Sequence, residues 1–527
     1  MAKTVLARAA LALALAAGLS TTSPAADLTV GLRADVNIDP HYLFLGPNMA
    51  MSRHLFGALV DLDENSKRRP GLALSWRPLD DTTWEFKLRP GVKFHDGSDF
   101  SAEDVAFTIK RIPTIPNNPN PYTPNIRSIV ATEIVDPLTV RFKTGRPNPA
   151  LPGQLTNVFM VSRKAAADAA PADFVSGKAA IGTGPFRFVE YARADRLVLA
   201  RNDAYWGEKP VWEKVTFRFL PNTAARVAAL LSGAVELIDY VPPTDIESIE
   251  KSGRAKVFKR VSDRVMYLAP MSGADKLALT TDKAGAPLAA NPMKDARVRR
   301  AISKAINREV LVARAMEGLA VPSTQLIPEG FGSYNARIPL EAFDPDGARR
   351  LLVEAGFPNG FGFLIGCTSD RYVNDGQVCQ AVGQMLNRAG LAAKVETYPS
   401  SIFFARTVAP KSDVPLMLLG LSSSSTGDSI HALSSVLHSY DREKGMGVQN
   451  FSVYTNKELD ALVERAVVTL DDQSRDRMLQ EAMALAMQDL GIIPLYTQMT
   501  ISAARTGIDY VPRMDEQAVV MHARPAR

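Results

Sequence analysis

Two short patterns in the 527-residue chain match the chemistry of serine acyl-transfer enzymes. The run Ser248-Ile-Glu-Lys251 has the Ser-x-x-Lys spacing of a serine nucleophile and its lysine, and Lys143-Thr-Gly145 matches the Lys-Thr-Gly that accompanies it. In those enzymes the second pattern follows the first along the chain, whereas here it precedes it. We therefore expect both patterns to be structural and the protein not to be an enzyme. A secreted serine hydrolase is the alternative from a different class of protein.

The residues that bind metals or phosphates in other proteins are not grouped here. His431 and His438 are seven residues apart and can share a helix face, but two imidazoles alone make a poor metal site. Gly182-Thr-Gly184 lacks the spacing and the following helix of a nucleotide-binding loop and is typical of a turn. We therefore expect no metal and no cofactor. A net charge of +5 over 527 residues is too small to indicate a nucleic-acid-binding protein.

The first 25 residues have the order of a secretory signal peptide. Lys3 and Arg8 form a positive end, an apolar run of small residues follows, and Ser23 and Ala25 suit the positions before a cleavage site. The apolar run is about 11 residues long, and a spanning helix needs about 20. We expect cleavage after Ala25 and a periplasmic location. No cysteine lies near the cleavage site, so we expect no lipid anchor.

Cys367 and Cys379 are the two cysteines of the chain. The first ends an expected strand, and the second lies in the first turns of the helix that should follow it. Two cysteines in an oxidising compartment can pair. We expect a disulfide between them, and two buried free thiols are the alternative.

The remaining chain alternates between strand and helix patterns. Residues 215–240 and 362–398 each read as a β–α–β unit, which indicates parallel strands. A continuous amphipathic helix is expected over Asp295–Gly318. Residues 67–180 read as a self-contained α+β unit inserted between these segments. The simplest assembly is two α/β lobes, each completed by segments that are distant in sequence.

A set of longer motifs, in one order over about 430 residues, resembles the signature of the family 5 extracellular solute-binding proteins. These proteins are the dipeptide- and oligopeptide-type receptors of ABC importers. The matching stretches are Leu72–Trp76, Thr83–Gly97, Ser101–Val105, Gly182–Arg187, Asn202–Trp206, Arg226–Gly233, Asp295–Ile302, Asp344–Leu352 and Asn456–Asp460.

The resemblance implies a bilobal periplasmic-binding-protein fold of type II, in its large three-domain variant. Lobe I would comprise residues 27–66, 180–268 and 494–527. An inserted α+β domain would comprise residues 67–179, and lobe II residues 269–493. The chain would cross between the lobes near Ala269 and near Gly491. The implied partners are a small solute and an ABC permease in the inner membrane, and we expect a monomer.

The resemblance also implies where a peptide would bind. In peptide-binding relatives the stretch after Asp-Pro-His offers its backbone to the peptide, and here that stretch is Phe44-Leu45-Gly46. A second loop reads Gly-Trp-x-x-Asp in peptide binders, and its Asp holds the peptide amine. The equivalent run here is Gly420-Leu421-Ser422-Ser-Ser424, so leucine replaces the aromatic residue and serine replaces the acid. Asp428 is a nearby carboxylate that can substitute, and a surface loop without a ligand is the alternative.

Two further positions are candidates on chemical grounds. Arg371 and Tyr372 follow the strand that ends at Cys367, where Arg can clamp a carboxylate and Tyr can stack on a ligand. The alternative for Arg371 is an ion pair with a neighbouring aspartate. Tyr267 and Met271 flank the expected crossing and are candidates for the cleft wall or for simple packing. The expected solute is a peptide or a peptide-like conjugate. A sugar or an opine-type solute is the alternative because the amine anchor is missing, and a chemosensory role would use the same fold.

Overall fold

One mixed β-sheet runs through both halves of the molecule. The computed structural model describes residues 27–407, 412–423 and 426–526, so the expected signal peptide and its cleavage after Ala25 lie outside the described residues. The sheet has 12 strands. Its path from one edge to the other is β10 (Phe186–Ala192), β11 (Arg196–Arg201), β12 (Lys214–Phe219), β1 (Asp27–Leu32), β13 (Leu237–Ile238), β20 (Ile493–Arg505), β14 (Ala255–Pro270), β19 (Leu416–Ser422), β17 (Gly362–Thr368) and β15 (Thr280–Thr281), with β16 (Ala320–Pro322) paired to β20 and β18 (Ala392–Tyr398) paired to β17.

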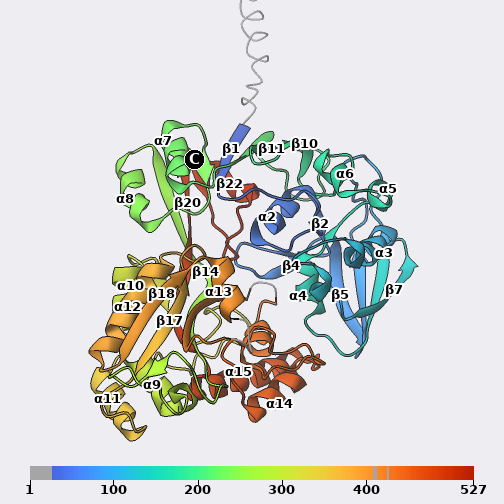
Figure 1. Ribbon diagram of the computed structural model, residues 1–527. Helices are drawn as coiled ribbons and strands as arrows, with labels where there is room; N and C mark the ends of the chain where they lie inside the picture. The colour runs from blue at the N-terminus through green and yellow to red at the C-terminus, as the bar shows by residue number, and fades with distance from the viewer. Residues whose placement is uncertain (1–26, 408–411, 424–425, 527) are drawn as a thin grey trace, which may run out of the picture.

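In lobe I the strands β12, β1 and β13 run parallel to one another. Between β12 and β13 the chain forms α7 (Thr223–Ser232), as the sequence predicts. The Asn222 side chain accepts the backbone N–H of Ala225 at the start of α7, and Gly233 ends the helix at a φ of +82°. Because β1 and β13 are parallel, the residues that follow them emerge at the same edge of the sheet. α8 (Pro243–Lys251) leads on from that edge to β14 (Figure 1).

In lobe II the second predicted β–α–β unit is also present. β17 and β18 are parallel, with Gly362 opposite Ala392, and α12 (Asp375–Arg388) connects them. Cys367 in β17 and Cys379 in α12 form a disulfide whose Cα atoms are 6.5 Å apart. The strand and the helix that flank the β17–α12 loop are therefore tied together covalently. Figure 1 shows this lobe on the opposite side of β14 from α7 and α8, which confirms the expected bilobal α/β fold.

The prediction of one continuous helix over Asp295–Gly318 is wrong. The structure has two helices, α9 (Ala296–Lys304) and α10 (Arg308–Ala315). The Asn307 side chain accepts the backbone N–H of Val310 and so caps a new helix, an arrangement that competes with helix continuation. The remaining helices of lobe II are α11 (Pro345–Glu354), α13 (Ser400–Thr407), α14 (Lys457–Ala466) and α15 (Asp472–Asp489). Within the described ranges, no helix combines the length and the apolar character needed to cross a bilayer.

The unit inserted into lobe I has its own sheet and its own core. Its antiparallel strands lie in the order β5 (Ala73–Asp80), β6 (Thr83–Leu88), β8 (Thr139–Thr144) and β7 (Ile129–Asp136). α3 (Ala102–Arg111) begins at Ser101, which forms a capping box with Asp104. Phe86 and Phe142 are fully buried in a separate hydrophobic cluster. Two short antiparallel strand pairs lie where the unit meets lobe I: β2 (Gly57–Ala58) pairs with β9 (Phe159–Met160), which is distant in sequence, and β3 (Val60–Leu62) forms a hairpin with β4 (Arg68–Pro70).

The Gly182-Thr-Gly-Pro turn is the joint between the inserted unit and lobe I. A side chain at Gly184 would place its Cβ 2.5 Å from a backbone oxygen at the end of α2 (Gly46–Leu55), so only glycine fits there. The Gly184 carbonyl accepts from His95 Nε2 at 3.1 Å and from Asn202 Nδ2 at 3.0 Å. Trp206 Nε1 donates to the Thr183 carbonyl at 3.1 Å. Several stretches that carry the family resemblance therefore meet at one structural contact.

The lobes are connected through the long antiparallel pair β14 and β20. Their register shifts between Val261 and Val265, so that three residues of β14 bulge out of the ladder. Before this bulge β14 pairs only with β20, and after it β14 also pairs with β19 of lobe II. The bulge therefore marks the passage from one lobe to the other on this strand, a few residues before Ala269. Within the bulge, Arg264 lines the space between the lobes and Asp263 is buried.

Candidate functional site

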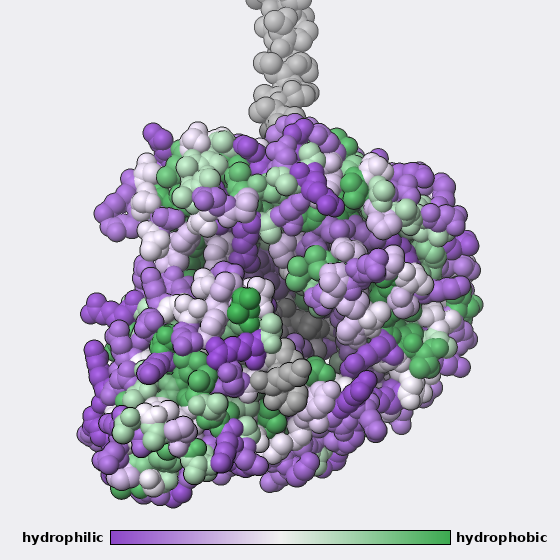
Figure 2. Space-filling view, in the orientation of Figure 1, coloured by the Kyte–Doolittle hydropathy of each residue, from purple (hydrophilic) through white to green (hydrophobic). Residues whose placement is uncertain are grey.

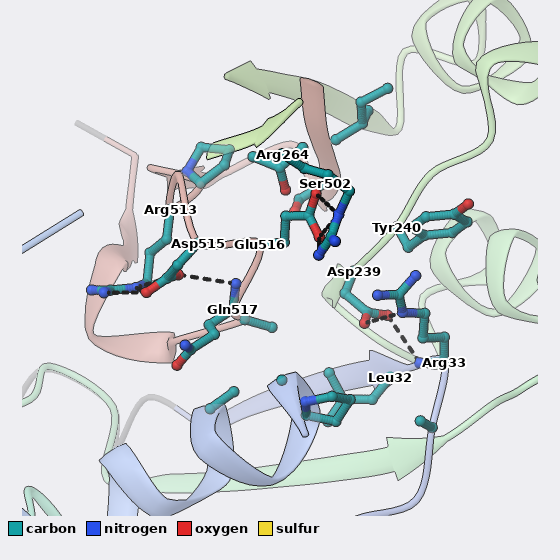
Figure 3. Close-up of a pocket in the computed structure, with 18 of the residues that line it drawn as sticks. Leu32, Arg33, Asp239, Tyr240, Arg264, Ser502, Arg513, Asp515, Glu516 and Gln517 are labelled. Atoms are coloured by element: carbon teal, nitrogen blue, oxygen red, sulfur yellow. Dashed lines mark hydrogen bonds and ion pairs between the residues drawn. The ribbon is translucent and has the colours of Figure 1, made fainter. Parts of the chain in front are cut away.

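A cavity of about 250 Å³ lies between the two lobes. Four parts of the chain form its walls: the residues after β1 and β13, the start of α2, the middle of β14 and β20 with the C-terminal strap (residues 510–518), and the loop after β17. Figure 2 shows the surface hollowed between the lobes, and Figure 3 shows the side chains that line the cavity. Ligand pockets of 300–1,000 Å³ hold drug-sized molecules, so this cavity suits a small solute rather than a long chain.

On the lobe I side, the Arg33 guanidinium lies over the ring of Tyr240. The guanidinium carbon is 4.3 Å from the centre of the tyrosine ring. Tyr240 has a φ of +53°, which is unfavourable for a residue with a side chain. The fully buried Arg226 stabilises this turn by donating to the carbonyls of Asp239 and Tyr240 at 3.2 and 3.0 Å. Burial raises the pKa of the Asp239 carboxyl, and Arg33 opposes that rise.

On the hinge, the pair of strands β14 and β20 that connects the lobes, Arg264 binds Glu516 of the C-terminal strap. Arg264 Nη2 donates to one oxygen of Glu516 at 2.9 Å, and Arg264 Nε lies 3.2 Å from both oxygens (Figure 3). Gln498 of β20 donates to the same carboxylate at 2.5 Å. Burial alone would raise the pKa of the Glu516 carboxyl, but Arg264 beside it holds that pKa below its ordinary value. Glu516 is therefore an anion inside the cavity wall.

Asp263 is buried beside this pair. Burial, reinforced by the negative charge of Glu516, raises the pKa of the Asp263 carboxyl to about 6. Its backbone N–H donates to the Met514 carbonyl at 2.9 Å, which ties the bulge of β14 to the strap. Ser422, at the end of β19, donates its hydroxyl to Asp263 Oδ2 at 2.5 Å and is not part of the cavity wall. Ser424 lies outside the described residues.

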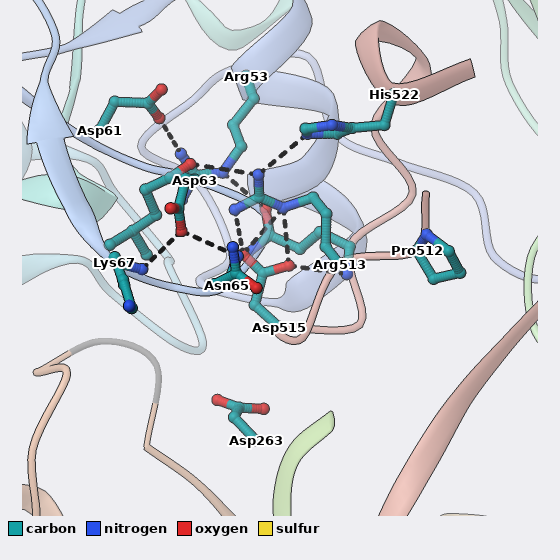
Figure 4. A network of polar contacts seen from close by, with 12 residues as sticks. Arg53, Asp61, Asp63, Asn65, Lys67, Asp263, Pro512, Arg513, Asp515 and His522 are labelled. Atoms are coloured by element: carbon teal, nitrogen blue, oxygen red, sulfur yellow. Dashed lines mark hydrogen bonds and ion pairs between the residues drawn. The ribbon is translucent and has the colours of Figure 1, made fainter. Parts of the chain in front are cut away.

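The strap is fixed to lobe I by a second polar network (Figure 4). Arg513 binds the Asp515 carboxylate with its Nη2 at 2.7 Å and its Nε at 3.0 Å, and both side chains are almost fully buried. Arg53 of α2 donates to the Gln517 side chain at 2.9 Å and to Asp61 at 2.8 Å. The strap therefore lies in a set position between α2 and the hinge strands.

On the lobe II side, Arg371 and Tyr372 line the cavity. The Asp375 carboxylate shapes their loop, because it accepts the backbone N–H of Arg371 at 3.2 Å and of Tyr372 at 3.3 Å. Thr368 donates to the same oxygen at 2.6 Å. The Arg371 guanidinium carbon lies 5.2 Å from the ring centre of Phe404 and 5.6 Å from that of Tyr372. Arg371 therefore does not form the side-chain ion pair with an aspartate that was its alternative role.

Only part of the stretch predicted to present its backbone to the solute, residues 44–46, lines the cavity. Leu45 and Gly46 line it. Phe44 turns away: its ring packs edge-to-face on Tyr122 at a centroid distance of 4.9 Å. The Phe44 backbone is occupied by Asn120, whose carbonyl accepts the Phe44 N–H at 2.7 Å and whose side chain donates to the Phe44 carbonyl at 2.6 Å. The Phe44 backbone is thus engaged with the inserted unit.

Four other predicted positions lie away from the cavity wall. Tyr267, Met271 and Leu421 are buried in the large hydrophobic core centred on lobe II. Asp428 is buried as well, and its carboxylate accepts from Arg475 of α15 at 2.6 Å. These side chains are occupied by packing or by an ion pair, so the carboxylate of Asp428 does not face the cavity described here.

Sequence reasoning missed most of the charged residues of the wall. Arg33 and Asp239 directly follow strands that the sequence does predict, and the ends of parallel strands are where α/β proteins place ligands, so a signal existed for them. Arg264 and Glu516 had no comparable signal. They are 252 residues apart and meet only because the strap folds back onto the hinge.

The patterns of enzymatic type are not part of this site. The Ser248 hydroxyl donates to the Asp245 carbonyl at 2.9 Å, and Lys251 pairs with Glu247 on the outside of α8. Lys143 belongs to β8 of the inserted unit. Across the described residues, no group of three or more His, Cys, Asp or Glu side chains is placed to hold a metal ion.

Comparisons with known proteins agree with the fold. The family model "Bacterial extracellular solute-binding proteins, family 5 Middle" matches residues 67–444. The glutathione-binding protein GsiB of Escherichia coli K12 is 27% identical over 505 residues, covering 94% of this chain and 93% of GsiB. The ABC transporter substrate-binding protein CtaP of Listeria monocytogenes superposes with a TM-score of 0.81 at 22% identity, covering 95% and 99% of the two chains. The binding protein AgaA of A. tumefaciens R10, solved with agropinic acid, superposes with a TM-score of 0.71 at 22% identity over 95% and 99%.

Proposed function

Because the chain belongs to family 5 of the bacterial extracellular solute-binding proteins, we propose that it captures a peptide or peptide-like solute for an ABC permease of the inner membrane. The observation that carries this proposal is the cavity between the lobes, whose wall includes side chains from both of them. A solute that contacts both lobes binds the closed form more tightly than the open form, and only such a difference can drive closure. The permease would then recognise the closed receptor.

Arg371 is the residue we assign to the solute's acidic end. It is exposed on the lobe II wall, and its loop is held by Asp375, so its guanidinium is pre-positioned; among the described residues it has no carboxylate partner. A bidentate contact with a carboxylate is a strong charge-assisted interaction. A peptide C-terminus supplies that carboxylate, and so does the acid group of an opine.

An opine-type solute is the second candidate. It is favoured by the serine at position 424, where peptide binders of this family carry the acid that receives the amine. AgaA, which has this fold, was solved with agropinic acid, and GsiB is named for glutathione, a peptide. A sugar is less well suited to the charged residues of this wall.

A thermal-shift and calorimetric screen of the mature chain tests the proposal. The probes are dipeptides, glutathione, agropinic acid, an oligosaccharide and Ni²⁺. A true solute at 100 times its dissociation constant should stabilise the protein by about 2.7 kcal/mol. Arg371→Met should weaken an acidic solute by at least about 10-fold, whereas the matched control Arg146→Met, at an exposed site of the inserted unit outside the cavity wall, should not. Failure of every peptide and opine probe to bind, or chemical conversion of a probe, would overturn the proposal.

The same proposal includes export through the signal peptide at residues 1–25, a free periplasmic protein and a monomer. The disulfide between Cys367 and Cys379 is consistent with an oxidising compartment. N-terminal sequencing of the protein from a periplasmic extract should begin at Ala26. Recovery of the mature chain in the cytosol with Met1 intact would contradict export.

A further inference from the structure

Four arginines line the cavity, and two of them have carboxylate partners in ideal geometry. Arg264 binds Glu516 through two nitrogens, and Arg513 binds Asp515 in the same way. Each of these pairs is neutral as a unit. A bidentate pair also uses the planar edge with which a guanidinium recognises a carboxylate. These two arginines therefore support the wall and have little capacity left to receive an anionic ligand.

The other two arginines are arranged differently. The Arg33 guanidinium lies over the Tyr240 ring at 4.3 Å and the Arg371 guanidinium over the Phe404 ring at 5.2 Å, and an aromatic contact of this kind leaves the N–H groups available to a ligand. In the part of the chain that the structure describes, no side chain accepts a hydrogen bond from the Arg33 guanidinium, and the Arg371 guanidinium makes one long contact of 3.4 Å to the Tyr372 hydroxyl. Arg33 belongs to lobe I and Arg371 to lobe II. Each lobe thus presents one open guanidinium to the same cavity.

Asp239 forms an ion pair with Arg33, but the pair is long, and the same carboxylate accepts the Arg33 backbone N–H at 2.9 Å. The distance from Arg33 Nε to Asp239 Oδ2 is 4.0 Å, which is beyond hydrogen-bond range. The same carboxylate lies 3.7 Å from Nε of the buried Arg226, so one negative charge is shared between two positive ones. The Arg33 side chain is 38% exposed, so it is accessible to a solute. The lobe I wall therefore keeps an excess positive charge.

We propose that the solute carries two carboxylates, one bound by Arg33 of lobe I and the other by Arg371 of lobe II. This inference rests on the proposed function and narrows its substrate class to small diacids, such as acidic dipeptides, γ-glutamyl peptides or dicarboxylic opines. A diacid bridges the two lobes through its two ends. Neither carboxylate alone connects both lobes, so the second acid group is what favours the closed form.

Matched pairs of probes test the inference, with affinity measured by calorimetry. The first pair is glutathione and its glycine amide, and the second is alanyl-glutamate and alanyl-glutamine. Within each pair that binds, the diacid should bind about 10- to 100-fold more tightly, since each charge-assisted contact is worth about 1.5–3 kcal/mol. Arg33→Met keeps the apolar contact with Tyr240 and should reduce the difference to less than about 3-fold. Arg33→Lys keeps the charge without the planar edge, so its affinity difference between diacid and amide should lie between those of the wild type and Arg33→Met. Arg146→Met is the control and should leave the difference unchanged.

The outcomes separate this inference from the proposed function. Equal affinity for diacid and amide, or binding of neutral and singly acidic solutes while every diacid fails, overturns the inference and leaves the receptor function standing. An unchanged preference for diacids in Arg33→Met also overturns it. Failure of every solute in the wider screen removes the proposed function as well. Thermal unfolding of each variant without ligand shows whether it is folded, and Arg33→Lys provides the second folded variant if Arg33→Met is not.

Discussion

The ion pair between Arg264 and Glu516 should couple the hinge to the C-terminal strap measurably. The perturbations are Arg264→Met, Glu516→Gln and the double substitution. The side chains are 22% and 16% exposed, and their closest atoms are 2.9 Å apart. A surface pair contributes at most about 1 kcal/mol, while breaking a buried pair costs about 3–5 kcal/mol. This pair lies between those limits, and we expect a coupling free energy of about 2 kcal/mol.

The Coulomb term allows that magnitude. At 2.9 Å and an effective dielectric constant of about 20, two unit charges attract by about 6 kcal/mol, and removal of both groups from water offsets most of this. The Gln498 amide, 2.5 Å from the Glu516 carboxylate, adds a charge-assisted hydrogen bond that Glu516→Gln weakens as well. The single substitutions should therefore each lower the free energy of unfolding by more than the coupling alone, and the double substitution by less than their sum.

Urea unfolding of the four proteins at pH 7 measures the coupling as a double-mutant cycle. The folded-state pKa of Glu516 lies below its ordinary value, so its contribution is present above about pH 4.5 and is lost as the pH falls through the folded-state pKa. The coupling should therefore shrink between pH 5 and pH 3. A coupling below about 0.3 kcal/mol at pH 7, or one that does not change with acid, would refute the assignment of this pair as the connection between hinge and strap.

Three further expectations follow from single features of the structure. Gly184→Ala should lower the free energy of unfolding by about 3 kcal/mol in urea titration, because the new Cβ would lie 2.5 Å from a backbone oxygen. The control Gly46→Ala, where no atom lies within 4 Å of the new Cβ, should change the free energy of unfolding by less than about 0.5 kcal/mol. Similar values for the two variants would contradict the close contact at Gly184. The folded-state pKa of Asp263 is raised to about 6, so the folded protein binds a proton there more tightly than the unfolded chain does. The wild type should therefore gain about 2 kcal/mol of stability relative to Asp263→Asn as the pH falls from 7.5 to 4.5. Parallel pH profiles of the two proteins would contradict this expectation. Replacing Cys367 and Cys379 by serine should lower stability by about 2–3 kcal/mol, and two free thiols found by mass spectrometry of the non-reduced wild type would exclude the bond.

Local patterns were sufficient to predict much of the fold. The helix α7 lies between an asparagine cap and a glycine stop that can be read directly, and both β–α–β units follow from the alternation of strand and helix. The helix predicted over Asp295–Gly318 failed for an equally local reason. Its hydrophobic spacing continues through Asn307, but the Asn307 side chain binds the backbone and starts a second helix. Periodicity reports which face is buried and does not report a cap in the middle of the pattern.

The site was less predictable because its charges come from distant parts of the chain. Arg371 and Tyr372 were predicted because they follow a recognisable strand, and Arg33 follows another but was not singled out. The position of Glu516 depends on a φ of +61° and on a strap that returns to the hinge after the whole of lobe II. No pattern within a few residues of Glu516 encodes either feature. Phe44 and Leu45 could not be told apart from the sequence either. They are adjacent, yet Phe44 packs against a hydrophobic core and Leu45 lines the cavity.

The residues that identify the family and the residues that face the cavity perform different tasks. Gly184 and Trp206, from two of the recognisable motifs, contact the inserted unit: the Gly184 carbonyl accepts from His95, and the Trp206 ring lies 4.6 Å from the Arg89 guanidinium carbon. Arg226, from a third motif, donates to carbonyls behind Tyr240 and so sets the backbone of the wall without reaching the cavity itself. Such contacts can be shared by receptors for unrelated solutes, because they position the wall and leave its chemistry free. Arg33 lies outside those motifs, and its side chain is held by the turn that Arg226 stabilises. The receptor class can therefore be read from the framework, whereas the solute has to be inferred from the few side chains that the framework presents.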